Sequence, residues 1–231
     1  MNRPSERLAA ISAEVVGCRA CPRLVEWREK VAAEKRASFA DEVYWGRPIP
    51  SFGDPEARIL IVGLAPAAHG GNRTGRMFTG DRSGDWLYAS LYRCGQANQP
   101  LAVARDDGLE LHDVFIGAAV RCAPPANKPL PVERDRCLPY LERELQVLPN
   151  VVVLVALGAF AWDAALRVVS HLGHEVPAPK PRFGHEAETK IGPYTLLGSY
   201  HPSQQNTFTG KLTEAMTDAV FTRAKELGEG D

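Results

Sequence analysis

One stretch of the chain passes from a short apolar run straight into a loop dense in glycine. The loop spans residues 63–81 and has the sequence GLAPAAHGGNRTGRMFTGD, with the apolar run 59–62 before it and a helical pattern around Leu91 after it. A strand that enters a helix through such a loop is how open α/β sheets build a ligand crevice at their carboxyl edge. Small residues, arginines, Phe78 and Asp81 stand together in the loop. This mixture suits a flat ring carried on a phosphate chain.

The bulk properties are those of an ordinary globular protein. The 231 residues are 45% hydrophobic and 24% charged, enough for one domain spanning residues 1–231. The formal net charge of −1 provides no global basic field, so phosphate binding would depend on a local patch. The N-terminus is polar and the longest apolar run, 151–162, is too short to span a bilayer. We expect a cytoplasmic protein with no membrane partner, and a monomer, since nothing argues for an oligomer.

Four apolar runs alternate with helical patterns along the chain. The predicted strands are 58–64, 113–120, 151–157 and 194–200. The predicted helices are 11–35, interrupted by Pro22, then 132–148, 159–169 and 211–227. This alternation predicts a single α/β domain of three layers, α/β/α, around a central four-stranded parallel sheet. The segments 45–54 and 172–192 are rich in proline and glycine and are predicted to be irregular.

The loops after the first, second and fourth predicted strands carry most of the unusual chemistry. They begin at Gly63, at Arg121 and at His201. The carboxyl ends of parallel strands share one edge of a sheet, so we expect these loops to meet there.

The cysteines suggest a metal centre. Cys18 and Cys21 form a CxxC pair beside a proline, Cys122 and Cys137 lie far along the chain, and Cys94 stands alone in a helical pattern. Four thiolates can hold zinc or an iron–sulfur cluster. The absence of a second CxxC favours a bulkier cluster over a zinc ribbon, and buried thiols that act as small apolar side chains are the alternative.

These motifs together resemble the iron–sulfur uracil-DNA glycosylases of bacteria and archaea, most closely the family 5 branch known as UDGb. The matching segments are the CxxC pair, the loop 63–81, RCAPPANK from Arg121, Cys137, and SYHPSQQNT from Ser199. They follow the family's order over nearly the whole chain. The resemblance implies a four-stranded parallel sheet between helices. It also implies a [4Fe-4S] cluster on Cys18, Cys21, Cys122 and Cys137, and excision of a damaged base from DNA.

Two positions depart from the sister family 4. Leu64 stands where that family has an acid that would position the attacking water. Ala118 stands where it has an asparagine that would bind the edge of uracil. A pocket without this donor and acceptor should discriminate less between bases. The resemblance to family 5 accordingly implies a wider substrate range that includes hypoxanthine and xanthine.

A base inside a duplex must be rotated out before it can be cleaved from its sugar. Phe78 is the candidate plate on which the extruded ring stacks; an ordinary core aromatic is the alternative. Backbone groups would contact the base edge without an intervening side chain, and the residues assigned to them are Gly63, Leu64, Ala65 and Pro66. Ala118 would line the same pocket.

Cleavage moves negative charge onto the base and positive charge onto the sugar. His201 is the candidate donor to the leaving base, and a histidine that only stabilises a turn is the alternative. Asp81 is the candidate partner of the sugar cation or of the attacking water; its alternative is an N-cap for the following helix. Asn127 is a third catalytic candidate, since it could position water or contact the lesion.

The segment 203–208 is predicted to enter the duplex from which the base leaves. Gln204, Gln205 and Asn206 would fill the vacated space and Phe208 would act as a wedge; a plain surface turn is the alternative. The candidate phosphate contacts are Arg73, Arg76, Arg82, Lys128 and Lys211.

The expected partner is therefore DNA that contains uracil or another deaminated base, which implies a nucleoid-associated protein. A non-catalytic, metal-stabilised DNA-binding module stays open as the alternative, and an unrelated α/β hydrolase ranks behind it because the chain lacks a GxSxG elbow.

Overall fold

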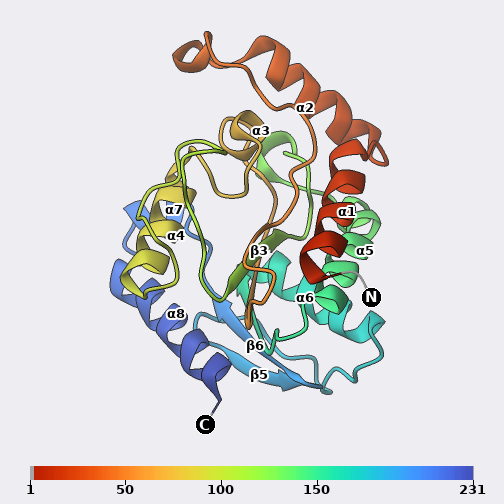
Figure 1. Cartoon of the computed structure of the whole chain (residues 1–231), viewed down its shortest axis with the longest axis vertical. Helices are drawn as coiled ribbons and strands as arrows, with labels where there is room; N and C mark the ends of the chain where they lie inside the picture. The colour runs from red at the N-terminus through yellow and green to blue at the C-terminus, as the bar shows by residue number, and fades with distance from the viewer. Residues whose placement is uncertain (1–2, 231) are drawn as a thin grey trace.

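The computed structural model describes residues 3–230 (Figure 1). Its α-helices are α1 (Pro4–Gly17), α2 (Pro22–Glu34), α3 (Gly71–Thr74), α4 (Arg82–Arg93), α5 (Pro131–Val147), α6 (Ala159–His171), α7 (Gln204–Phe208) and α8 (Glu214–Glu229). Its strands are β1 (Phe52–Gly53), β2 (Ile59–Gly63), β3 (Val114–Ala118), β4 (Val153–Leu157), β5 (Glu188–Ile191) and β6 (Tyr194–Ser199). Single 3₁₀ turns lie at Ala37–Phe39 and Pro125–Asn127.

The strands form one mixed sheet in the order β1-β3-β2-β4-β6-β5. The four central strands are parallel, which confirms the predicted parallel sheet. Two short antiparallel strands, β1 and β5, extend it at its edges and lie in the segments predicted to be irregular. β1 has only two residues, and β5 alternates exposed polar residues with less exposed ones. Neither therefore has the apolar run that marks a central strand.

Helices cover both faces of the sheet, as the three-layer prediction requires (Figure 1). Alternate residues of β2 point to opposite faces because side chains in a strand alternate. Leu60 and Val62 pack in one core with α1, α5 and α6. Ile59 and Ile61 pack in the other core with α4 and α8.

The first predicted helix is two helices, α1 and α2, separated at the CxxC segment. Pro22 is the first residue of α2, a position where proline loses no intrahelical hydrogen bond. The short connection between the helices carries Cys18 and Cys21, both of which are partly buried.

The carboxyl ends of the central strands are tied together by backbone hydrogen bonds. Ala119 donates to the Gly63 carbonyl at 2.9 Å, and Val120 donates to the Leu64 carbonyl at 3.1 Å. Gly158 donates to the Ser199 carbonyl at 2.8 Å. The loops that follow these strands therefore start from one edge of the sheet. Within residues 3–230, no helix combines the length and the apolar character needed to cross a membrane.

Candidate active site

The Phe78 ring lies directly over the end of β2. A Cβ atom added to Gly63 would lie 2.8 Å from Cζ of Phe78, and one added to Gly84 would lie 1.7 Å from the Phe78 carbonyl oxygen. Phe78 itself has a positive φ of 50°, which is rare for a bulky side chain. Two glycines on different elements therefore make room for one strained aromatic residue, a pattern typical of functional sites.

His201 follows β6 and lies beside this ring. The two ring centroids are 6.2 Å apart, with an angle of 35° between the planes. The His201 carbonyl oxygen accepts from the Ser203 N–H at 2.8 Å and from the Asn206 side-chain amide at 2.9 Å, which fixes the backbone at this point. Burial lowers the pKa of His201 to about 4, so its imidazole is neutral at pH 7.

Asp81 caps the N-terminus of α4. Its Oδ1 accepts from the backbone N–H groups of Ser83 at 2.9 Å and Gly84 at 3.0 Å. Its Oδ2 lies so close to Gly70 that a Cβ there would be 1.9 Å away. Burial raises the pKa of Asp81, while the two capping N–H groups act in the opposite direction. Asp81 therefore caps α4 in the structure, and its Oδ2 receives no hydrogen bond from the described residues.

The remaining loop residues assigned to the pocket lie on the same strand end. Gly63 pairs in register with Ala118 of β3, which is buried in the core against which Phe78 packs. Leu64 is partly buried, and Ala65 packs toward Cys122.

The segment after His201 forms the short helix α7. Gln204 and Gln205 are exposed, and Phe208 is 68% exposed. The Arg82 guanidinium lies 5.6 Å from the centre of the Phe208 ring, so α7 adjoins the start of α4. Asn206 differs from its neighbours because its amide is used to hold His201.

Asn127 is exposed on the turn after β3. It and Ala126 have positive φ values of 55° and 52°, so two successive residues hold a left-handed conformation. Its side chain forms no hydrogen bond within residues 3–230, and the structure does not join it to the Phe78–His201 pair.

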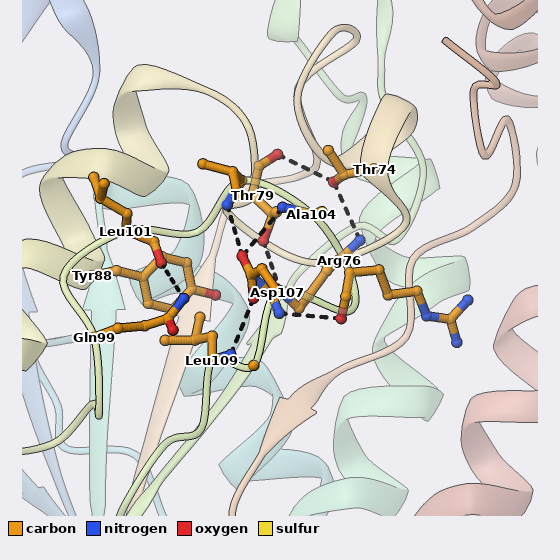
Figure 2. A network of polar contacts seen from close by, with 12 residues as sticks. Thr74, Arg76, Thr79, Tyr88, Gln99, Leu101, Ala104, Asp107 and Leu109 are labelled. Carbon is orange, nitrogen blue, oxygen red and sulfur yellow. Dashed lines mark hydrogen bonds and ion pairs between the residues drawn. The ribbon is translucent and has the colours of Figure 1, made fainter.

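The prediction that Arg76 contacts phosphate is wrong. Arg76 is 4% exposed and its guanidinium is paired with Asp107 at 2.7 Å. Its Nε donates to Thr79 at 2.9 Å and its Nη1 to the Arg105 carbonyl at 3.2 Å, and Figure 2 shows how these contacts surround it. A charge this deeply buried and paired shapes the loop from within.

Arg73 is also buried and paired with a carboxylate. It is 9% exposed, donates to the carbonyls of His69 and Gly80 at 2.9 Å each, and pairs with Glu42 at 2.5 Å. Its predicted phosphate contact is therefore also wrong, because its donors already fold residues 69–80 into a closed turn.

Other cations do face solvent. Arg82, Lys128 and Lys211 are exposed, as a phosphate contact requires. Sequence reasoning missed Arg47 and Arg105, whose guanidinium carbons lie 5.9 Å and 4.7 Å from the centre of the Trp45 ring. Both are exposed and neither forms an ion pair within residues 3–230. In the sequence, the triplet WGR at residues 45–47 marks two of these residues, but it lies in the segment 45–54, which is predicted to be irregular.

We call the group of Trp45, Arg47 and Arg105 the Trp45 platform. It packs against the glycine-rich loop. The backbone N–H of Trp45 donates to the Arg73 carbonyl at 2.9 Å, and a Cβ on Gly75 would lie 3.0 Å from the Trp45 ring. The Arg105 carbonyl is the group that accepts from buried Arg76.

The four cysteines that the resemblance assigns to a cluster line one cavity. Cys18 and Cys21 reach it from the α1–α2 turn, Cys122 from the loop after β3 and Cys137 from α5. Leu24, Val25 and Val120 supply apolar walls. Cys94 lies elsewhere, beside Thr222 of α8.

Donor groups point at these sulfurs. Arg28 donates to Cys122 Sγ at 3.1 Å, and the Arg121 backbone N–H donates to Cys137 Sγ at 3.3 Å. Burial raises the pKa of the Cys122 thiol to about 11 and that of Cys137 to about 12. Burial thus favours the protonated form of both thiols. No three His, Cys, Asp or Glu side chains in residues 3–230 are arranged to hold one metal ion, whereas a cluster spreads its ligands over a larger body.

The comparisons with known proteins agree with this geometry. Residues 50–225 match the family model described as the uracil DNA glycosylase superfamily, and the chain belongs to this superfamily of DNA glycosylases.

The relatives define the branch. Proteins named Type-5 uracil-DNA glycosylase from Mycobacterium tuberculosis and Thermus thermophilus are 54% and 52% identical to the chain, over 95% and 92% of its length and 81% and 94% of theirs. A Type-4 uracil-DNA glycosylase from Thermotoga maritima is 30% identical over 88% of the chain and 85% of its own length. The expected resemblance to family 5 is confirmed.

The buried Arg76–Asp107 pair predicts a pH-dependent stability. Burial alone would raise the pKa of Asp107, but Arg76 and three backbone N–H groups outweigh it and hold the pKa at about 2. Since this lies below the ordinary value of 3.8, the stabilisation is complete above pH 4 and is lost as pH falls toward 2. Asp107→Asn should lower the free energy of unfolding at pH 7 by about 2 kcal/mol or more.

Urea unfolding at pH 7 and pH 3 measures this effect, with the exposed neighbour Asp106→Asn as control. The gap between Asp107→Asn and the unsubstituted protein should narrow at pH 3, while Asp106→Asn stays close to the unsubstituted protein at both. A gap of equal size at both pH values would show that the ionised carboxylate is not the stabilising group.

Proposed function

We propose that the protein excises uracil from DNA by hydrolysing the bond between base and deoxyribose, leaving an abasic site. The observation that carries the proposal is the neutral imidazole of His201 beside the seated ring of Phe78, at the carboxyl edge of the sheet. Membership of the superfamily and the printed names of the relatives support the same activity.

Phe78 would receive the extruded base. Rotating a base out of a duplex costs a few kcal/mol, least for a mispaired base, and stacking on an aromatic ring returns about 1–3 kcal/mol. Gly63 lets the Phe78 ring lie close to the end of β2, and Gly84 lets α4 lie close to the Phe78 backbone, so the ring would be in place before DNA binds.

His201 would stabilise the negative charge that develops on the leaving base. A neutral imidazole carries one N–H, which can donate to a base oxygen without a proton transfer. A donor held in place before the reaction is worth about 10²–10³ in rate in comparable sites. The hydrogen bonds of Ser203 and Asn206 to the His201 carbonyl fix the backbone that carries the imidazole.

Asp81 would act on the sugar side. Its Oδ1 is engaged in capping α4, and this rigid attachment leaves Oδ2 to face the positive charge that develops on the deoxyribose or to orient water. Asn127, on its exposed turn, stays a secondary candidate for the same step.

We also propose that other deaminated bases, hypoxanthine and xanthine among them, are substrates. Ala118 and Leu64 present no hydrogen-bonding group to the base edge, so recognition falls to the backbone of residues 63–66. A site without a dedicated side-chain donor cannot strongly reject a related base.

The cavity of Cys18, Cys21, Cys122 and Cys137 would hold a [4Fe-4S] cluster. The bound group supplies covalent links among the α1–α2 turn, the loop after β3 and α5. No step of the excision passes through it.

DNA would lie across the exposed cations and α7. Arg82, Lys128, Lys211 and the Trp45 platform would contact phosphates, while Gln204, Gln205 and Phe208 would enter the duplex. Binding to DNA would bring the protein to the nucleoid.

The activity is tested on 5′-labelled duplexes that carry uracil, hypoxanthine or xanthine at one position, with an unmodified duplex as control. After incubation with the protein, alkali should break the strand at the abasic site left by each of the three lesions. The control duplex should stay intact. Breaks at uracil alone would contradict the wide range. Binding without breaks would instead support a non-catalytic DNA-binding module.

Single-turnover rates on the uracil duplex test the catalytic roles. His201→Ala should lower the rate about 100-fold or more. Asp81→Asn should also lower it while α4 stays folded, because an amide oxygen can accept the same capping N–H groups. The exposed His112→Ala serves as control and should react at the wild-type rate. Wild-type rates for both site variants would refute the assignment.

Salt dependence tests the Trp45 platform. The double variant Arg47→Ala/Arg105→Ala should weaken binding to any duplex and reduce the slope of log affinity against log salt by about one per lost contact. Fluorescence anisotropy on a uracil-free duplex measures this. Arg143→Ala, an exposed arginine paired with Glu14, is the matched control and should keep the slope. An unchanged slope in the double variant would remove the platform from the DNA-binding face.

A further inference from the structure

Arg28 of α2 is buried with an incomplete set of partners. It is 2% exposed and ranks among the largest fully buried side chains. Its Nη1 donates to Cys122 Sγ at 3.1 Å and its Nη2 to the Cys18 carbonyl at 3.3 Å. Its Nε is buried and has no hydrogen-bond partner. The guanidinium therefore contacts two of the four cysteines that line the cavity.

No buried carboxylate within residues 3–230 pairs with the Arg28 guanidinium. The nearest acidic group within residues 3–230 is Glu29, 3.8 Å from Nη2 and about half exposed. Glu29 already accepts two hydrogen bonds from Arg19. Solvent and a second arginine thus weaken the compensation that Glu29 gives Arg28.

Arg121 shows what a compensated arginine looks like in the same region. It is 1% exposed, and its guanidinium pairs with Glu144, which is equally buried, and with Ser51. A buried charge without such a partner costs several kcal/mol. The weakly compensated charge of Arg28 therefore implies an anion at the cysteines that its guanidinium contacts.

We propose that Arg28 is the buried counter-charge of the iron–sulfur cluster and raises the reduction potential of that cluster through Cys122. The inference rests on the proposed cluster and is independent of base excision. A cluster with four thiolate ligands carries a net negative charge, which grows by one on reduction. A fixed positive charge nearby stabilises the reduced form more than the oxidised form, so the potential rises.

The other groups around the cavity differ from Arg28. The Arg121 N–H to Cys137 is a neutral donor, and Arg136 is exposed to solvent. Glu133, which also lines the cavity, is neutralised by Arg23 at 2.6 Å. Arg28 is thus the charge with the greatest leverage on a bound cluster, because water does not screen it.

The test compares Arg28→Met, which removes the charge, with Arg28→Lys, which keeps it. The control is Arg134→Met, another buried arginine, whose charge is paired with Asp135 and Asp163. The proteins are purified without oxygen. Iron and sulfide per chain are then measured, and the reduction potential is determined by redox titration followed by electron paramagnetic resonance.

Arg28→Met should have a lower potential than the unsubstituted protein, and Arg28→Lys and Arg134→Met should stay close to it. If Arg28→Met fails to hold iron while Arg28→Lys holds it, the requirement for charge is also supported. Equal potentials in Arg28→Met and the unsubstituted protein would overturn the proposal, as would equal loss of iron from both Arg28 variants.

The readouts separate this proposal from the proposed function. An unsubstituted protein that contains zinc or no metal would refute the cluster, whatever its activity on uracil. A protein that holds the cluster and cleaves no lesion would refute the excision and leave the role of Arg28 intact.

Discussion

The close packing of Phe78 against two glycines is the constraint on which the site depends. Gly63 ends a buried strand and Gly84 begins a helix, and a Cβ atom at either position would collide with Phe78. The aromatic ring is thereby held at the sheet edge, where the loop after β6 brings His201 to 6.2 Å. An aromatic ring and an imidazole thus meet at the carboxyl edge of the sheet.

Buried arginines give this arrangement its rigidity. Arg73 donates to two carbonyl groups of the glycine-rich loop, and Arg76 donates to the Thr79 hydroxyl and the Arg105 carbonyl. Glu42 and Asp107 balance their charges. Arg28 is a further buried arginine, which donates to Cys122 and has only the half-exposed Glu29 as an acidic neighbour within the described residues. Other arginines and lysines, among them Arg82, Lys128 and Lys211, remain exposed to solvent.

The sequence predicted the four parallel strands and the meeting of their loops, because central strands are continuously apolar and topology determines the shared edge. It did not predict β1 or β5, whose residues lack that apolar run. It misplaced Arg73 and Arg76 because an arginine in a loop has the same pattern whether it faces solvent or a distant carboxylate. Trp45 and its two arginines were missed for the converse reason, since their stacking exists only in the folded chain.

The central claim is that an extruded base stacks on Phe78 within reach of His201. The most direct test is a crystal structure with a duplex that carries 2′-fluoro-deoxyuridine. In this nucleotide the fluorine makes the bond between base and sugar resist hydrolysis. The account predicts the uracil ring parallel to Phe78, with one of its oxygens within hydrogen-bond distance of a His201 ring nitrogen. A uracil that remains in the helix, or one that is bound away from both residues, would contradict it.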